Sequence, residues 1–131
     1  MTKSVLNVLI IEDEPILAKN ICAYLVRYGY EVRLAATAEA GLSELKNFRP
    51  DVIVLDFNLP GMNGLEALYK IRAIDSQIKV IMMTAHGSAD LAAKTMRAGA
   101  SDFVTKPISV ANLKLKLDGI VIDARSDHEL S

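Results

Sequence analysis

The sequence predicts one α/β domain with a parallel β-sheet that is covered by helices on both faces. Five short apolar runs alternate along the chain with five stretches in which apolar residues have helical spacing. The connections are short, and regular alternation of this kind implies right-handed crossovers between parallel strands. With 131 residues, of which 51% are hydrophobic and 24% charged, the chain has the size and composition of a single globular domain.

The first strand and helix are predicted within residues 5–29. Residues 5–11 (VLNVLII) are β-branched and almost entirely apolar, which favours a strand. Pro15 fits the first turn of a helix, where its missing N–H removes no hydrogen bond, and Gly29 fits the position after the helix end. The apolar residues of this helix share one face: Leu17, Ile21, Tyr24, Leu25 and Tyr28.

The second strand and helix are shorter. Residues 31–36 are predicted as the strand, and Thr37 is placed to cap the helix that follows. Leu42 and Leu45 supply the apolar face of this helix, which stops before Pro50.

The third strand is the most apolar stretch of the chain. Residues 52–55 (VIVL) form an unbroken run, which is typical of a strand buried on both faces, and the run ends abruptly at Asp56. Asn63, with Glu66 three residues later, resembles a capping box that opens a helix through about Ile74.

The fourth strand is predicted over residues 78–83 (IKVIMM). Ser88 caps the next helix and Gly99 closes it. The apolar face of this helix carries Leu91, Thr95 and Met96.

The last strand and helix complete the domain. Residues 102–105 are predicted as a short strand, and the domain is predicted to span residues 1–124. Residues 125–131 are interpreted as a polar tail, either a cut linker or a natural end. The last helix has one apolar face with Leu113, Leu117, Ile120, Val121 and Ala124.

Composition and charge exclude several classes of protein. The 15 basic and 16 acidic residues are spread along the chain without a basic stripe, so direct nucleic-acid binding has little support. Cys22 is the single cysteine, which excludes an internal disulfide and a cysteine-based zinc site. The apolar runs are shorter than the roughly 18 residues that a membrane span needs, and no signal peptide is recognisable. We therefore expect a cytoplasmic protein.

Polar residues follow four of the predicted strands at the point where each strand ends. These residues are Glu12 and Asp13, then Asp56, Thr84 and Lys106. Because the carboxyl ends of parallel strands meet at one edge of the sheet, we expect these side chains to converge. Three converging carboxylates repel one another and favour a hard cation such as Mg²⁺, with Lys106 as a second positive charge. Such an edge suits phosphoryl transfer.

These motifs resemble the receiver domain of two-component response regulators. The resemblance runs from about Val5 to Ala124 and rests on four motifs in order: Glu12-Asp13, the segment DFNLPGMNG from residue 56 to residue 64, Thr84-Ala85 and Lys106-Pro107. It implies a flavodoxin-like sheet with strand order 2-1-3-4-5. It also implies a switch that is phosphorylated and dephosphorylates itself, rather than a turnover enzyme.

The resemblance implies a role for each site residue. Asp56 is the expected phosphoacceptor, and Asp13, Asp56 and the backbone carbonyl of Asn58 are the expected direct ligands of Mg²⁺. Glu12 stands where Asp is more common in the family, and we expect it to reach the metal through water. Thr84 and Lys106 are expected to bind phosphoryl oxygens, with the Lys106-Pro107 bond in the cis form.

The remaining implied roles concern switching and lifetime. Phe103 matches the aromatic switch position of the family and is expected to swing inward when Thr84 moves toward the phosphoryl group. Asn58 and His86 match positions that influence how fast the aspartyl phosphate hydrolyses. The read-out surface is expected on the helix after Ser88, the strand at residues 102–105 and the last helix.

The resemblance also implies partners. A histidine kinase or a phosphotransfer protein is the expected phosphodonor, and an output domain that this chain lacks, or a separate partner, is the expected target. Homodimerisation through the read-out surface is a further expectation. The segments MTAHGS and MRAGASDFVTKPI look like receivers of the NtrC class of transcription regulators.

These residues also allow other interpretations. Asp56 could be a buried structural acid, and Glu12-Asp13 a solvated helix start. A receiver that acts without phosphorylation, purely as an interaction module, would need no complete set of acids, Thr84 and Lys106. A flavin-phosphate binder needs Ser, Thr or Gly donors after the first strand, and Glu-Asp-Glu-Pro stands there instead.

Overall fold

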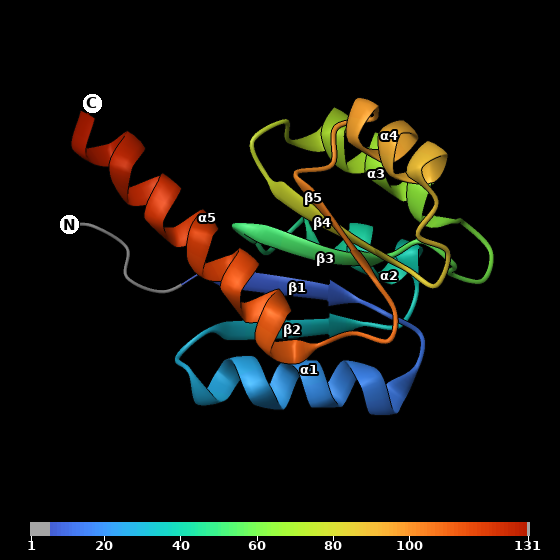
Figure 1. The fold of residues 1–131 in the computed structure, drawn as a ribbon, viewed down its shortest axis with the longest axis horizontal. Helices are drawn as coiled ribbons and strands as arrows, with labels where there is room; N and C mark the ends of the chain where they lie inside the picture. The colour runs from blue at the N-terminus through green and yellow to red at the C-terminus, as the bar shows by residue number, and fades with distance from the viewer. Residues whose placement is uncertain (1–5, 131) are drawn as a thin grey trace.

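The structure is a five-stranded parallel sheet in the order β2-β1-β3-β4-β5 with helices on both faces (Figure 1). This computed structural model describes residues 6–130, and the side chains of residues 6–120. The predicted fold class and strand order are confirmed. In chain order the elements are β1 Asn7–Ile11, α1 Pro15–Arg27, β2 Glu31–Ala35, α2 Ala38–Glu44, β3 Val52–Asp56, α3 Gly64–Ile74, β4 Lys79–Thr84, α4 Ala89–Arg97, β5 Asp102–Thr105 and α5 Val110–Leu130.

The three inner strands are buried on both faces. Every residue of β3 is buried, which matches its unbroken apolar run, whereas β2 lies at an edge and is buried only at Ala35. Successive side chains of β1, β3 and β4 point alternately to two apolar layers. Leu9, Ile53 and Met82 face the layer under α2 and α3, whose members include Leu68 and Ile71 of α3.

The opposite layer packs against α1 and α5. It contains Val8, Val54 and Met83 from the sheet, with Ile21 of α1 and Leu117 of α5. Figure 1 shows these two helices together on one side of the sheet, with α2, α3 and α4 on the other. Among residues 6–130, none of the helices combines the length and the hydrophobicity that a membrane-spanning segment requires.

The predicted N-caps are confirmed at three helices. Thr37 accepts a hydrogen bond from Ala40 N at 3.0 Å, and Asn63 accepts one from Glu66 N at 2.9 Å. Ser88 caps α4 in the same way, by accepting from Leu91 N at 3.1 Å. Each cap satisfies one of the backbone N–H groups that a helix start leaves unpaired.

The element ends differ from the prediction by small shifts and one larger one. Residues 6 and 36 are outside the strands, Val5 lies outside the described residues, and the fourth strand covers Lys79–Thr84. The larger difference is at the end of the chain, where α5 continues to Leu130 through the segment predicted as a polar tail. Extending a helix costs much less than starting one, so polar residues can prolong it. The domain boundary at residue 124 stays a prediction.

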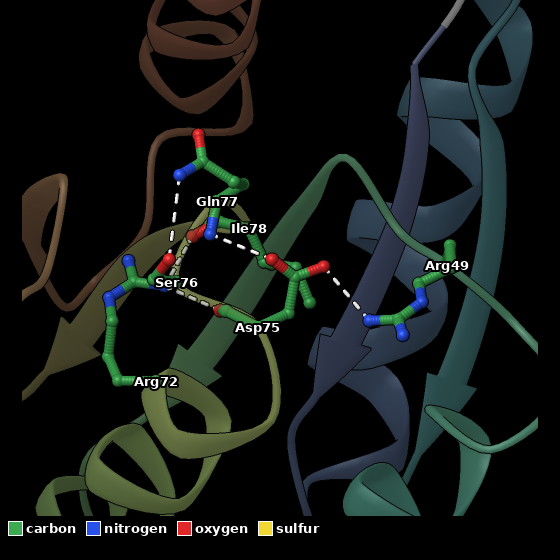
Figure 2. Close-up of polar contacts among 6 residues, drawn as sticks. All are labelled: Arg49, Arg72, Asp75, Ser76, Gln77 and Ile78. Carbon is green, nitrogen blue, oxygen red and sulfur yellow. Dashed lines mark hydrogen bonds and ion pairs between the residues drawn. The ribbon is translucent and has the colours of Figure 1, made fainter.

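A polar cluster ties the end of α3 to the start of β4 (Figure 2). Arg49 forms an ion pair with Asp75 at 2.9 Å, and Asp75 Oδ1 accepts a hydrogen bond from Gln77 N at 2.8 Å. Arg72 reaches from α3 to the carbonyl oxygen of Ile78, with Nη1 at 2.5 Å. This cluster lies at the edge of the sheet where the strands begin.

Candidate functional site

Four strands deliver polar side chains to the edge of the sheet where the strands end. Glu12 follows β1, Asp56 and Thr84 are the last residues of β3 and β4, and Lys106 follows β5. The register pairs Asp56 with Met83 and Thr84 with Thr105, so the strand ends are level. Glu12 and Asp56 are each only 2% exposed, and Thr84 is fully buried. The predicted convergence is confirmed for these residues.

Three carboxylates form an acidic cluster at this edge. Glu12, Asp13 and Asp56 each offer one oxygen, and these oxygens lie within 4.8 Å of one another. Asp13 is exposed, whereas the other two acids are buried. A buried acid beside two others is costly unless a cation is near, because like charges repel strongly where water is excluded.

Lys106 supplies one of the cations. Its Nζ lies 2.9 Å from Glu12 Oε1 and 3.3 Å from Asp56 Oδ2, so the closer partner is Glu12. Burial lowers the pKa of Lys106, but its contacts with the two acids outweigh burial and raise the pKa above its ordinary value. The backbone holds the residue in place, since Lys106 N donates to Thr84 O at 2.7 Å. The Lys106-Pro107 bond is cis, as the resemblance implied.

Glu12 is the most strongly perturbed acid of the site. Burial, together with the charge of Asp56, raises the pKa of its carboxyl group from 4.5 to about 7, against the hydrogen bonds from Glu14 N and Lys106 that lower it. Glu12 Oε2 accepts the bond from Glu14 N at 3.0 Å. One lysine therefore does not offset the burial of Glu12 beside Asp56, and the site favours a further positive charge.

The loop after β3 is held close to Asp56. Asp56 Oδ1 accepts a hydrogen bond from Asn58 N at 3.1 Å, which folds the loop back over the carboxylate. Gly64, the first residue of α3, donates its N–H to Phe57 O at 2.8 Å. A Cβ atom on Gly64 would stand 2.6 Å from Asp56 O and from Phe57 Cα, so only glycine allows this approach. Sequence reasoning missed this role, although a glycine directly after a helix cap was a visible signal.

The donor set fits Mg²⁺. The cluster consists only of oxygen atoms, it carries more negative than positive charge, and the exposed Asp13 leaves one side open to water. The side chains that would hold the ion are Glu12, Asp13 and Asp56. The role of the Asn58 backbone carbonyl as a ligand of Mg²⁺ stays a prediction.

The other predicted residues lie around this cluster. Thr84 Oγ1 accepts a hydrogen bond from His86 N at 3.1 Å, which ties the start of the loop before α4 to the site. The His86 side chain is exposed. Phe103 of β5 is half-buried and packs against the layer under α2 and α3. The roles predicted for His86 and Phe103 stay predictions.

Comparison with known proteins gives a consistent result. Residues 8–118 match the model of the response regulator receiver domain. The chain is 33% identical over 115 residues to the probable transcriptional regulatory protein TcrX of Mycobacterium tuberculosis, covering 88% of this chain and 49% of TcrX. It is 33% identical over 111 residues to the regulatory protein LuxO of Vibrio vulnificus, covering 85% of this chain and 24% of LuxO.

Comparison with solved structures gives the same result as the sequence comparisons. A receiver domain protein from Methanospirillum hungatei, described as CheY-like, superposes with a TM-score of 0.88 at 29% identity, covering 95% of this chain and 99% of that one. The chain spans from about a quarter to about half of the length of the two curated relatives. The match across the whole sheet, together with the acidic cluster at its edge, shows that the chain belongs to the response regulator receiver domain family.

Proposed function

We propose that Asp56 accepts a phosphoryl group from a phosphohistidine of a histidine kinase or phosphotransfer protein. The observation that carries the proposal is the position of Asp56, which is buried at the end of β3 between Lys106 and two further acids. An Asp56 carboxylate oxygen attacks the phosphorus atom, the P–N bond to the donor histidine breaks, and the electron pair of that bond returns to the imidazole. The product is an acyl phosphate.

The surrounding residues stabilise the charge that this transfer spreads over the phosphoryl oxygens. Lys106 Nζ lies 3.3 Å from Asp56 Oδ2, and it pairs with one phosphoryl oxygen. Thr84 donates its hydroxyl hydrogen to another oxygen. Asp13, Asp56 and the carbonyl of Asn58 would hold Mg²⁺, and the ion would supply positive charge beside the transferring group.

The phosphorylated state is read out on the surface of α4, β5 and α5. Phe103 turns further inward as Thr84 moves toward the phosphoryl group, and this surface then controls an output domain or a partner. Asn58 and His86 set the rate at which the acyl phosphate hydrolyses. Support comes from their positions, since Asn58 N contacts Asp56 and His86 N contacts Thr84.

The wider setting is part of the same proposal. The likeness to LuxO and to NtrX from Brucella abortus, at 26% identity and a TM-score of 0.88, supports a receiver of the NtrC class. In this setting the receiver works in the cytoplasm, controls transcription through a further domain, and pairs with a second copy through the surface of α4, β5 and α5.

Intact mass spectrometry tests the chemistry directly. The protein is incubated with Mg²⁺ and acetyl phosphate, beside Asp56→Asn and a control, Asp90→Asn, which changes an exposed acid of α4. We expect a gain of one phosphoryl group that needs Mg²⁺, persists in the control and vanishes in Asp56→Asn. A wild-type protein that binds no Mg²⁺ and forms no adduct with any donor would refute the proposal and support a phosphorylation-independent interaction module.

A further inference from the structure

Helix α4 packs on the sheet with little buried apolar surface. Among the described residues, Thr95 is the one buried residue of α4, whereas α3 buries four residues. Ala98, just after the helix, packs partly against the layer under α2 and α3. Little apolar surface therefore holds α4 in the position seen here.

The one buried side chain of α4 is also polar and unpaired. Thr95 is 0% exposed, and its Oγ1 has no hydrogen-bond partner among the residues that the structure describes. A helical threonine can bond the carbonyl oxygen three or four residues before it. A buried hydroxyl without a partner is destabilising, while an apolar group of the same shape is neutral or favourable. Thr95 therefore destabilises α4 in its present position on the sheet.

The C-terminal end of α4 is held firmly by a residue of another helix. Arg72 of α3 donates to Gly99 O from Nε at 2.9 Å and from Nη2 at 2.7 Å. The same guanidinium bonds Ile78 O at the start of β4, as Figure 2 shows. Gly99 has φ +109°, and a Cβ atom there would stand 3.0 Å from Arg72 Nε. A cation at a helix C-terminus is favourable, so the contact fixes this end.

The N-terminal end of α4 is connected to the candidate site. The loop before α4 begins at Thr84, whose Oγ1 accepts the hydrogen bond from His86 N. Gly87 lies against β5, because a Cβ atom there would be 2.3 Å from Thr105 Cγ2. Ser88 and Ala89, which follow, are exposed. A movement of Thr84 is thus passed to the N-terminal end of α4, where the chain is exposed.

We infer that α4 is a hinged helix that pivots at the contact between Arg72 and Gly99. The unpaired Thr95 hydroxyl destabilises the packing of this helix on the sheet. Phosphorylation as the driving event rests on the function proposed above. The pivot itself is a property of the unphosphorylated fold and can be tested without it.

The first test changes the packing of α4 on the sheet. Amide hydrogen exchange is measured by NMR for residues 89–97 in Thr95→Val, with Thr95→Ser as the matched variant that keeps the hydroxyl. We expect exchange in α4 to slow about tenfold in Thr95→Val, because the penalty of the unpaired group is removed. Thr95→Ser should not slow it. Faster exchange, or a lower stability to urea, in Thr95→Val would overturn the inference by showing that the hydroxyl has a partner.

The second test changes the pivot. Arg72→Lys removes the forked contact and keeps the charge, while Arg49→Lys changes another arginine of the same cluster and serves as the control. We expect exchange at Gly99 and Ala100 to speed up about tenfold in Arg72→Lys, with much smaller changes at Leu91 and Ala92. Equal acceleration at both ends of α4, or none at Gly99, would overturn the hinge.

A third arm separates this inference from the proposed function. The same exchange experiment is repeated after treatment with acetyl phosphate and Mg²⁺, while intact mass reports on Asp56. We expect phosphorylated wild-type protein to exchange faster at the N-terminal end of α4, and Thr95→Val to reduce this response about tenfold. Phosphorylated protein without any change in α4 would refute phosphorylation as the event that drives the hinge and leave the phosphoacceptor role standing. Absence of an adduct would refute the phosphoacceptor role, and the first two tests would still decide the hinge.

Discussion

Replacing Glu12 by Gln should stabilise the Mg²⁺-free protein at neutral and alkaline pH. Burial raises the pKa of Glu12 from 4.5 to about 7 in the folded state. One pKa unit corresponds to about 1.4 kcal/mol, so the ionised side chain costs the fold on the order of 3 kcal/mol. Gln has nearly the same shape and carries no charge, so Glu12→Gln removes most of this cost.

The sign of the pH dependence follows from proton binding. The folded state holds the Glu12 proton more tightly than the unfolded state, so unfolding releases a proton between pH 4.5 and about 7. The contribution of Glu12 to stability is therefore most favourable below pH 4.5 and is lost as the pH rises through about 7. Above this range the penalty is constant.

Urea unfolding with a chelator at several pH values between 5 and 8 measures the effect. We expect Glu12→Gln to exceed wild type by on the order of 2 to 3 kcal/mol at pH 8, with the difference shrinking toward pH 5. Added Mg²⁺ should reduce the difference, because a bound cation stabilises the folded wild type. Glu14→Gln, an exposed neighbour, is the control. Parallel pH profiles for wild type and Glu12→Gln would refute the reasoning.

Three further predictions concern the same edge of the sheet. Lys106→Met should slow phosphorylation by acetyl phosphate on the order of 100-fold, measured by intact mass, and an unchanged rate would contradict the role of Lys106. Gly64→Ala should lower the free energy of unfolding by about 1–3 kcal/mol and weaken Mg²⁺ binding in calorimetry, since its Cβ atom would displace the loop beside Asp56. Asn63→Ala should lower the free energy of unfolding by about 1 kcal/mol through the lost cap. A loss of Mg²⁺ affinity equal to that of Gly64→Ala would contradict a special role of Gly64.

The position of the site could be predicted because each strand ends at a visible change from apolar to polar residues. In β3 the change falls at Asp56, and in β5 it falls at Lys106. The parallel topology then places these ends at one edge, whatever the details of side-chain packing. The helix caps at Asn63 and Ser88 were predictable for a similar reason, because the capping bond is local in sequence.

The contacts within the site depend on distances that no local pattern contains. Lys106 lies closer to Glu12 than to Asp56, which depends on how far each side chain reaches from the ends of β1, β3 and β5. The approach of Gly64 to the backbone of Asp56 depends on how α3 packs on the sheet. The contact between Arg72 and Gly99 joins residues 27 positions apart, and the sequence around either residue does not indicate the other.

The polar cluster of Arg49, Asp75 and Gln77 lies where the strands begin, while the acids and Lys106 lie where the strands end. The whole length of the buried sheet separates the two. A probe attached where the strands begin therefore lies far from the acids and Lys106. A spin label or fluorophore introduced through Ser76→Cys, at an exposed position, together with replacement of Cys22, would report on the protein without disturbing the acids and Lys106 at the opposite edge of the sheet.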